Sequence, residues 1–175
     1  ALQGATGIMS VTGELAGPPV KVGVAWIDLI GGLTTAVGIL AALHERERSG
    51  IGQHIDLSLF DVGLMSMLNQ AQSYLLTVIS PHSLGTAHPQ IVPYQAFEAQ
   101  DGWFILAVGN DEQYRKMTEC IAHPELWDDE RFRTNADRVH HREELVAKLT
   151  EIFRSRRRDE WLEALKGSGV PTSLV

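Results

Sequence analysis

The first half of the chain contains two stretches of helical periodicity, each preceded by a short run with another pattern. Residues 1–21 are rich in glycine, proline and threonine, which predicts loops and turns. The mostly apolar run 21–27 predicts a buried strand, and apolar residues spaced by three and four then predict a helix over about 29–48. Polar and apolar residues alternate over 54–59, which predicts a second strand, before helical spacing returns over 60–75. Strand, helix, strand and helix in succession are typical of an α/β domain.

The pattern changes near residue 80. Segment 80–93 contains three prolines, one glycine and no periodicity, which predicts a linker or a functional loop. Two short runs, 94–97 and 103–108, then flank Asp101-Gly102, a dipeptide that is a strong signal for a β-hairpin. Helical spacing follows in three stretches, over about 111–121, 141–155 and 158–166.

These patterns predict an α/β fold class with a three-part organisation. Residues 1–79 are expected to form part of a large α/β domain together with connecting helices. Residues 80–93 are expected to be a linker or active-site loop, and residues 94–175 a small α+β domain. We place the domain boundary near residue 80 because the composition shifts there.

The composition is that of an ordinary globular protein, with 44% apolar and 21% charged residues. A net charge of -7 argues against general nucleic-acid binding, which draws its affinity from clustered lysine and arginine. Cys120 is the single cysteine and cannot form an intrachain disulfide, so we expect a reducing compartment. The seven histidines and this cysteine show no metal-ligand spacing, so no metal site is expected.

The longest apolar stretch, 22–43, is interrupted by Asp28 and four glycines. A charge inside a membrane span is costly, so we expect this stretch to be a strand and a buried helix in a soluble core, with no membrane partner. The chain begins Ala-Leu-Gln-Gly, without a methionine and without the positive region of a signal peptide. We therefore expect a fragment of a longer protein.

Asp28 is the strongest candidate for chemistry. It stands where the N-cap of the predicted helix belongs, and a helix start stabilises a carboxylate by roughly 0.3–1 kcal/mol when exposed. The unpaired N–H groups of such a helix end could also stabilise an oxyanion. Gly31 and Gly32 in the first turn leave room for a ligand to approach the backbone. The alternative is that Asp28 is only a capping residue, since aspartate is among the commonest caps.

Several short segments occur in the order found in one known family. They are GIMSVTG at 7–13, VGVAWID at 22–28, GILAAL at 38–43, ERSGIGQ at 47–53, DLSL at 56–59, GTAHP at 85–89, VPYQAF at 92–97 and GNDEQ at 109–113. Together they resemble the family III coenzyme A transferases, which include formyl-CoA, carnitine and glutarate transferases and the α-methylacyl-CoA racemases. Full-length members are more than twice as long, and the chain resembles their centre. The resemblance implies part of a Rossmann-like large domain, and two ring-like subunits that interlock into a homodimer.

The resemblance also implies roles for particular residues. Asp28 matches the family's nucleophile, whose carboxylate attacks an acyl-CoA thioester and passes through an aspartyl-CoA thioester. Gln3 lies in a stretch that borders the CoA-binding region in relatives, and Gly31 is a further candidate for contact with CoA. Residues that match a loop folding over the acyl intermediate are Gly85, Thr86, Ala87 and His88. His88 could hydrogen-bond the substrate or shield the anhydride from water, or it could be a loop histidine held by Pro89.

Three functions stay open at this point. The first is an acyl-CoA:carboxylate CoA-transferase with an acyl-CoA and a small, possibly dicarboxylic acid as partners, no permanently bound cofactor and a cytoplasmic location (mitochondrial if eukaryotic). The second is an α-methylacyl-CoA racemase, although GTAHP and VPYQAF favour the transferases. The third is a truncated, non-catalytic piece that serves as a dimerisation module. For either enzyme, the complete active site is expected to need sequence beyond this chain.

Overall fold

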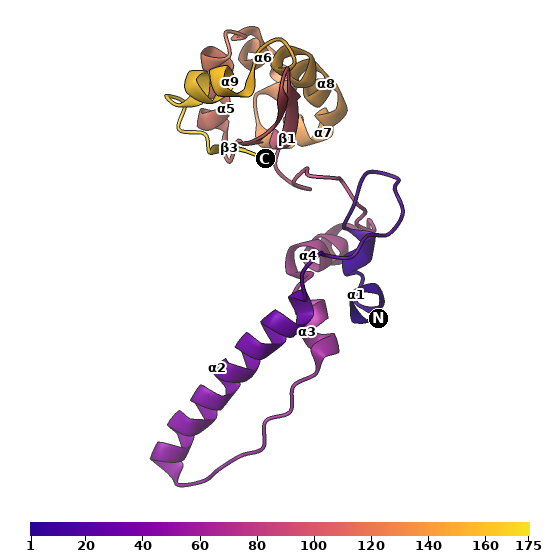
Figure 1. The fold of residues 1–175 in the computed structure, drawn as a ribbon, viewed down its shortest axis with the longest axis vertical. Helices are drawn as coiled ribbons and strands as arrows, with labels where there is room; N and C mark the ends of the chain where they lie inside the picture. Colours follow the sequence, from indigo (N-terminus) through magenta and orange to yellow (C-terminus); the bar gives the residue numbers. More distant parts are fainter. The chain divides into compact units, whose positions relative to one another are not determined.

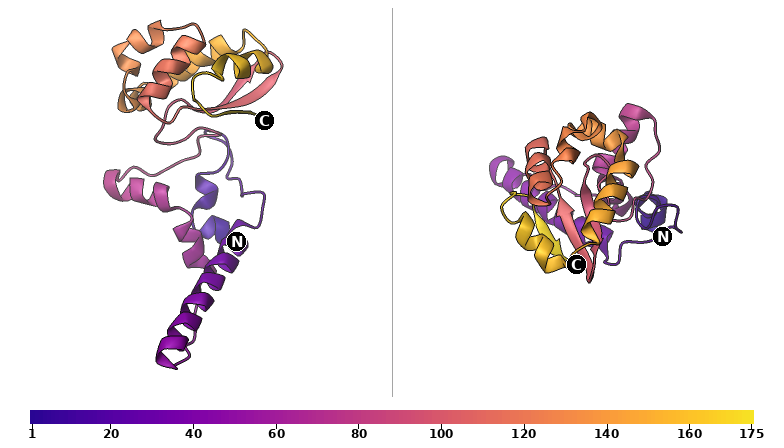
Figure 2. Two further views of the ribbon diagram at one scale, coloured as in Figure 1. Left: turned by 90° about the vertical axis from the view of Figure 1, so that its left-hand side faces the viewer. Right: turned by 90° about the horizontal axis from the view of Figure 1, so that it is seen from above.

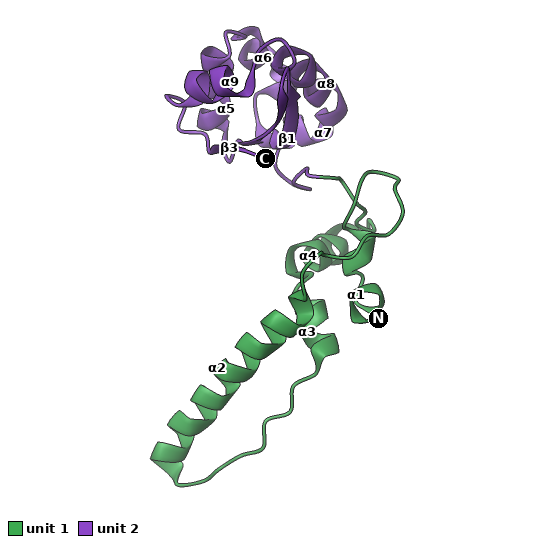
Figure 3. Cartoon of the chain, viewed as in Figure 1, with its two compact units in different colours: residues 1–85 green, residues 86–175 purple.

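The computed structural model describes residues 1–175 and divides into two compact units (Figures 1 and 3). Unit 1 comprises Ala1–Gly85 and unit 2 comprises Thr86–Val175. The division falls inside segment 80–93, where the sequence predicts a linker or active-site loop. The two units differ in character, since unit 1 is built from helices and loops while the strands of the chain all lie in unit 2.

Unit 1 is dominated by one long helix. Its elements are α1 (Leu2–Ala5), the 3-10 helix η1 (Ile8–Ser10), α2 (Trp26–Ser49), α3 (Leu59–Met65) and α4 (Leu68–Thr77). Helix α2 ends at Gly50, which takes the left-handed conformation that glycine adopts without strain. An extended segment then runs back along α2 to α3 (Figure 1). Ser58 caps α3, because its side chain accepts hydrogen bonds from the N–H groups of Phe60 and Asp61.

Two predicted strands in unit 1 are wrong. Residues 21–25 form no regular element and Trp26 already begins α2, while residues 51–58 run extended without pairing. A strand needs a neighbouring strand to take up its N–H and C=O groups, and unit 1 offers none. The predicted helix over 60–75 is present but interrupted at Ser66 and Met67, which divide it into α3 and α4.

The predicted position of Asp28 as N-cap is also wrong. Helix α2 begins three residues earlier than expected, so that Ala25 is the N-cap and Asp28 is the third residue of the helix. The N–H of Leu29 already bonds the carbonyl of Ala25 within the helix. Asp28 therefore contributes its charge to the first turn without capping it.

Little of α2 is buried within this chain, contrary to the expected buried helix. Ile27 is buried with Ile8 and Val62 in a small cluster, and Gly31 is the other buried residue of α2. The exposed large apolar side chains along the helix are Trp26, Leu29, Leu33, Val37, Ile39, Leu40 and Leu43. Such a continuous apolar surface is typical of an element that packs against further protein. By length and apolar composition α2 also qualifies as a membrane-spanning helix, a test that core helices of soluble proteins pass as well.

Unit 2 combines a small antiparallel sheet with six short helices. The sheet has the order β1 (Tyr94–Ala99), β2 (Gly102–Ala107) and β3 (Thr172–Leu174). The helical elements are α5 (Asp111–Cys120), α6 (Glu125–Asp128), the 3-10 helix η2 (Glu130–Phe132), α7 (Asn135–His140), α8 (Arg142–Phe153) and α9 (Arg158–Leu165). The hairpin predicted around Asp101-Gly102 is confirmed, with Ala99 opposite Gly102 at the turn. The three predicted helices correspond to α5, α8 and α9.

The core of unit 2 lies between the sheet and its helices (Figure 2). Phe97 and Phe104 of the hairpin meet Phe153 of α8, with ring centroids 5.0 and 5.1 Å from that of Phe153. Trp161 of α9 also packs against Phe153, with ring centroids 5.2 Å apart, and donates its indole N–H to the Phe153 carbonyl over 2.8 Å. This aromatic cluster is closed to solvent, so unit 2 has a complete hydrophobic core of its own. The chain as a whole therefore combines helices with one small antiparallel sheet, which lies in unit 2.

Candidate functional site

Asp28 presents a free carboxylate in the first turn of α2. The side chain is exposed and makes no hydrogen bond or ion pair within the chain. The purely structural alternative, in which the carboxylate caps the helix, therefore does not describe this residue. A cavity of about 250 Å³ adjoins it, lined by Ala1, Leu2, Gln3, Ile27 and Asp28. Two of the residues singled out in the sequence, Gln3 and Asp28, thus lie together.

Gln3 ties α1 to the segment that leads into α2. Its side-chain oxygen Oε1 accepts a hydrogen bond from the backbone N–H of Val22 over 2.8 Å. Because the oxygen is engaged there, the amide NH₂ at the other end of the side chain is the group left to donate. Gln3 therefore offers a neutral donor beside the cavity that Asp28 lines.

The two glycines of the first turns of α2 have different surroundings. A Cβ on Gly31 would meet Cδ2 of Leu59 at 2.6 Å, so this glycine permits the close packing of α3 against α2. The space at Gly31 is thus occupied by protein, which differs from the expectation of an opening for a ligand. Gly32 is exposed, and a Cβ added to it would have no neighbouring atom within 4 Å. The open backbone near Asp28 is therefore at Gly32.

Gly85 ends unit 1 and is held by a neighbouring loop. Its φ of +60° lies in the left-handed region, and a Cβ would come 3.1 Å from Oε2 of Glu14. Its N–H donates to the carbonyl of Gly13 over 2.9 Å, and the Ser83 hydroxyl donates to the carbonyl of Glu14 over 2.9 Å. These contacts explain the glycine by conformation and packing.

Thr86, Ala87 and His88 belong to unit 2 and are described there. The Thr86 hydroxyl oxygen accepts the N–H of Ala96 over 3.0 Å, which joins the loop to β1. The N–H of His88 donates to the carbonyl of Tyr94 over 2.8 Å, and the two rings stack with centroids 5.4 Å apart. Ala87 and His88 are both half-buried. The loop is thus attached to the edge of the hairpin.

The imidazole of His88 has a defined proton arrangement. Its Nδ1 accepts the backbone N–H of Gln90 over 3.1 Å. A backbone N–H can only donate, so the neutral ring carries its proton on Nε2. Burial lowers the pKa of His88 below its ordinary value, and the positive charge of Arg142 lowers it further. His88 is therefore set up as a neutral hydrogen-bond donor through Nε2.

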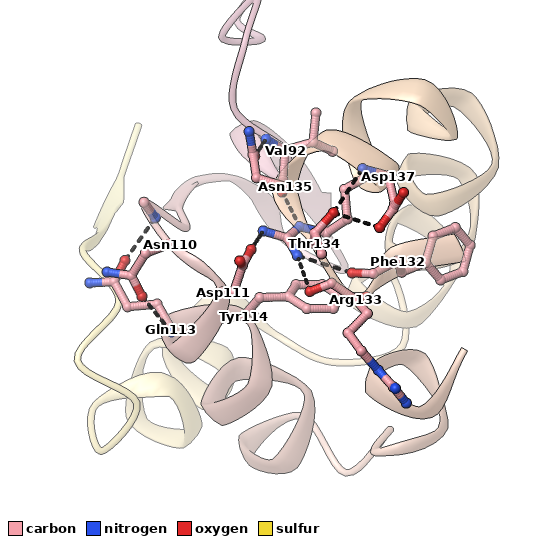
Figure 4. A network of polar contacts seen from close by, with 12 residues as sticks. Val92, Asn110, Asp111, Gln113, Tyr114, Phe132, Arg133, Thr134, Asn135 and Asp137 are labelled. Carbon is pink, nitrogen blue, oxygen red and sulfur yellow. Dashed lines mark hydrogen bonds and ion pairs between the residues drawn. The ribbon is translucent and has the colours of Figure 1, made fainter. Parts of the chain in front are cut away.

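Sequence reasoning missed the side chains that hold this loop. Asn135, Arg138 and Arg142 all bond backbone groups of segment 88–92. Figure 4 shows Asn135 beside Val92 within a wider polar network. Their spacing of three and four residues is a sequence signal for side chains that point the same way. The signal does not identify their partners, which lie more than 40 residues earlier in the chain.

Arg138 bonds to four residues of this network, which are labelled in Figure 4: Val92, Asp111, Phe132 and Arg133. Its side chain is fully buried, and Nε donates to the carbonyl of Val92 over 2.6 Å. Nη1 donates to the carbonyls of Phe132 and Arg133, each over 3.0 Å. Nη2 pairs with Asp111 over 2.8 Å at the start of α5, and the guanidinium lies 4.3 Å from the ring centroid of Tyr114. One buried cation thus joins the loop, η2 and α5.

Comparison with known proteins covers the whole chain. The family model described as CoA-transferase family III matches residues 1–175. The chain is 43% identical over 175 residues to succinate–glutarate CoA-transferase from Agrobacterium fabrum, covering 99% of this chain and 44% of that protein. It is 38% identical over 166 residues to human succinyl-CoA:glutarate CoA-transferase, covering 95% of this chain and 38% of that protein.

Solved structures show the same fold. A CAIB/BAIF family protein from Brucella suis superposes with a TM-score of 0.76 at 44% identity, covering 99% of this chain and 46% of that chain. Rv3272 from Mycobacterium tuberculosis superposes with a TM-score of 0.83 at 25% identity, covering 99% of this chain and 46% of that chain. The chain therefore spans less than half the length of the relatives it matches. Since the family model matches every residue, the chain belongs to CoA-transferase family III.

Proposed function

We propose that the complete protein transfers CoA between an acyl-CoA and a carboxylic acid, with Asp28 as the nucleophile. The observation that carries the proposal is a free carboxylate at Asp28, in a chain that belongs to CoA-transferase family III from end to end. A carboxylate without hydrogen bonds or ion pairs keeps its lone pairs available for attack. Its position in the first turn of α2 favours the negative charge between turnovers.

The proposed reaction proceeds through covalent steps at Asp28. The carboxylate attacks the thioester carbonyl of the donor, which gives a mixed anhydride and releases CoA thiolate. The thiolate attacks the aspartyl carbonyl, so that the donor acid leaves with one oxygen from Asp28 and an aspartyl-CoA thioester remains. The acceptor carboxylate then attacks this thioester, and the released thiolate takes the acceptor acyl group from the second anhydride. Asp28 is regenerated carrying one oxygen from the acceptor.

We propose a dicarboxylate such as succinate or glutarate among the acids exchanged. The relatives' names support this choice, since two of them contain succinate or succinyl-CoA together with glutarate. A third relative, 37% identical, is acetyl-CoA:oxalate CoA-transferase from Acetobacter aceti, and oxalate is also a dicarboxylate. We further propose that the protein acts as a homodimer, in which additional protein covers the apolar surface of α2. Light scattering of the complete protein measures that assembly.

The decisive test follows oxygen atoms. The complete protein is incubated with succinyl-CoA and glutarate labelled with ¹⁸O in its carboxylates, and the peptide containing Asp28 is analysed by mass spectrometry. The proposal expects ¹⁸O in Asp28 and, in later turnovers, in the released succinate. It also expects hydroxylamine to trap the thioester as a hydroxamate at Asp28. Transfer of CoA without label in this residue would refute the role of Asp28 as nucleophile. Absence of transfer to every acid tried would refute the proposed CoA-transferase activity.

Asp61 provides a matched control for Asp28. It is likewise the third residue of its helix, α3, and likewise exposed. Asp28→Asn is expected to lower transfer by about 10⁴-fold or more, as loss of a covalent nucleophile does, whereas Asp61→Asn is expected to leave it unchanged. The racemase alternative predicts a different result, since solvent deuterium would enter the α-carbon of a 2-methylacyl-CoA without any acid acceptor.

A further inference from the structure

Gln3 and Asp28 line one cavity because residues next to them in the chain pack together. Leu2 and Val22 both pack against the small apolar cluster that contains Ile27. Each of the two polar residues directly follows one of these apolar residues, Gln3 after Leu2 and Asp28 after Ile27. The apolar packing therefore brings the amide and the carboxylate to the same cavity of about 250 Å³. All of these residues belong to unit 1, so the arrangement depends on contacts within one compact unit.

The side-chain amide of Gln3 has a fixed direction. Its Oε1 accepts the N–H of Val22 over 2.8 Å, and turning the amide over would present to that N–H an NH₂ group, which cannot accept. The Nε2 group makes no hydrogen bond within the chain, although the oxygen beside it is engaged. The bond to Val22 thus leaves two free N–H donors on an amide whose orientation is set.

Gln3 is the one side-chain donor among the residues that line the cavity at Asp28. The others are Ala1, Leu2, Ile27 and Asp28 itself. A lysine or arginine at this place would pair with the carboxylate and hold it, because charge-assisted bonds are the strong ones. The neutral amide makes no bond to the carboxylate in the structure. It therefore leaves Asp28 free to attack, and still supplies a donor for negative charge that develops during the reaction.

A second cavity shares Gln3 and Ala1 with the first. It has a volume of about 430 Å³ and is lined further by Gly4, Met9, Pro19, Val20 and Lys21. Because Gln3 borders both cavities, a reactant that fills either one lies against its side chain.

We propose that Gln3 is a catalytic residue of the CoA-transfer reaction, whose Nε2–H donates a hydrogen bond to the oxyanion that forms on the carboxyl group of Asp28. This inference rests on the proposed function. When CoA thiolate or the acceptor carboxylate attacks the acylated Asp28, the electron pair of its C=O bond moves onto the oxygen. The pair returns as the leaving group departs, so no proton changes place and Gln3 stays neutral. A donor oriented beforehand stabilises the transition state more than the bound reactants.

Two replacements of Gln3 separate donation from support of the fold. Gln3→Glu keeps an oxygen for the N–H of Val22 and removes the donor, whereas Gln3→Met removes both and adds no charge. Gln72→Glu is the matched control, because it adds the same charge at an exposed position of α4 in unit 1. Gln3→Glu is expected to keep the wild-type thermal unfolding temperature, since its bond to Val22 is retained.

The reaction of the aspartyl-CoA form measures the donor directly. The complete protein is converted to this form with succinyl-CoA, and the appearance of glutaryl-CoA is followed after mixing with glutarate. Both Gln3 variants are expected to slow this step by about 10²-fold or more, the loss typical of one missing oxyanion donor. The KM for glutarate is expected to change less than about twofold, because the bond strengthens only in the transition state. Gln72→Glu is expected to react at the wild-type rate.

The stretching frequency of the thioester carbonyl gives a readout that a purely structural role of Gln3 would not change. In protein labelled with ¹³C in its aspartate carboxyl groups, the infrared difference between the aspartyl-CoA form and the free enzyme isolates the carbonyl at Asp28. A hydrogen bond from Nε2 weakens this C=O bond and lowers its frequency. Gln3→Met is therefore expected to raise the frequency, and Gln72→Glu to leave it unchanged.

The outcomes separate the donor role from its alternatives. A wild-type rate in Gln3→Glu would overturn the donor role, because only the bond to Val22 would then matter. A wild-type rate in Gln3→Met would overturn it too, since the loss in Gln3→Glu would come from the added charge. An unchanged carbonyl frequency in Gln3→Met has the same consequence. These results leave ¹⁸O incorporation at Asp28 intact, whereas a wild-type protein that forms no aspartyl-CoA and transfers no CoA overturns the proposed function as well.

Discussion

Replacing Arg138 with methionine is expected to destabilise unit 2 by about 3 kcal/mol or more. The substitution keeps much of the apolar stem but removes the donors for three backbone carbonyls and the partner of Asp111. The carbonyls of Val92 and Phe132 belong to residues with no solvent exposure, so water cannot replace the guanidinium there. A buried polar group left without a partner costs about 1–3 kcal/mol.

The other two bonds lost with Arg138, to Asp111 and to the Arg133 carbonyl, add little to the destabilisation. The Asp111 side chain is 49% exposed and regains hydration, so its stranded charge adds little. Arg133 is exposed, and water can reach its carbonyl. The two enclosed carbonyls together therefore account for a loss of about 2–6 kcal/mol. A unit of this size has about 5–13 kcal/mol of stability in total, so the loss takes a large share of it.

Urea unfolding of the 175-residue chain, followed by tryptophan fluorescence, measures this loss. Three of the four tryptophans, Trp103, Trp127 and Trp161, lie in unit 2 and dominate the signal. With a slope of about 1 kcal/mol/M for a small unit, the midpoint is expected to fall by about 3 M. Arg154→Met, which breaks an exposed pair, is expected to change stability by at most about 1 kcal/mol. A similarly small loss in Arg138→Met would show that the network in Figure 4 does not hold unit 2 together.

Three further predictions concern the stability of the separate units, two glycines of unit 1, and the carboxylate of Asp129. A fragment of residues 86–175 is expected to unfold cooperatively, because it encloses a complete core, whereas residues 1–85 alone are expected to show no cooperative transition in the same calorimetric scan. In the complete protein, where unit 1 packs against further sequence, Gly63→Ala is expected to cost about 1–3 kcal/mol because its methyl would come 2.6 Å from Thr6. Gly32→Ala, with open space around it, is expected to gain up to about 1 kcal/mol. Bonds from Arg131 lower the pKa of Asp129 to about 2, so its stabilising contribution is complete above about pH 4 and is lost as pH falls toward 2. Acid titrations of wild type and Asp129→Asn should therefore differ in that interval, and coincident curves would contradict the assigned cause.

The parts of the fold that could be predicted from sequence are those determined by neighbours in the chain. Asp101-Gly102 encodes its turn locally, and Gly102 takes the positive φ of 140° that a turn glycine supplies. Helix α5 begins at a cap that is also local, since the Asn110 side chain accepts the N–H of Gln113. No partner elsewhere in the chain is needed for either element. The sequence predicts both within one or two residues of their observed bounds.

The errors arise where distant partners decide the outcome. Segments 21–27 and 54–59 have strand-like patterns, but a strand exists only beside another strand, and no pattern within a segment reveals whether one is present. The short β3 escapes prediction for the converse reason, because Thr172–Leu174 becomes a strand by pairing with β2, more than 60 residues earlier. The side-chain contacts that hold segment 88–92 cannot be predicted locally either, since Asn135 and Gln90 are 45 residues apart.

The proposed chemistry accounts for the lack of contacts at the Asp28 carboxylate. Asp28 must attack one carbonyl and then be attacked at its own, so its carboxylate has to adopt more than one orientation. A side chain fixed by caps or ion pairs would resist that change, and Asp28 has neither. Freedom of the Asp28 side chain is therefore expected of a transferase that forms and breaks two anhydrides in each turnover.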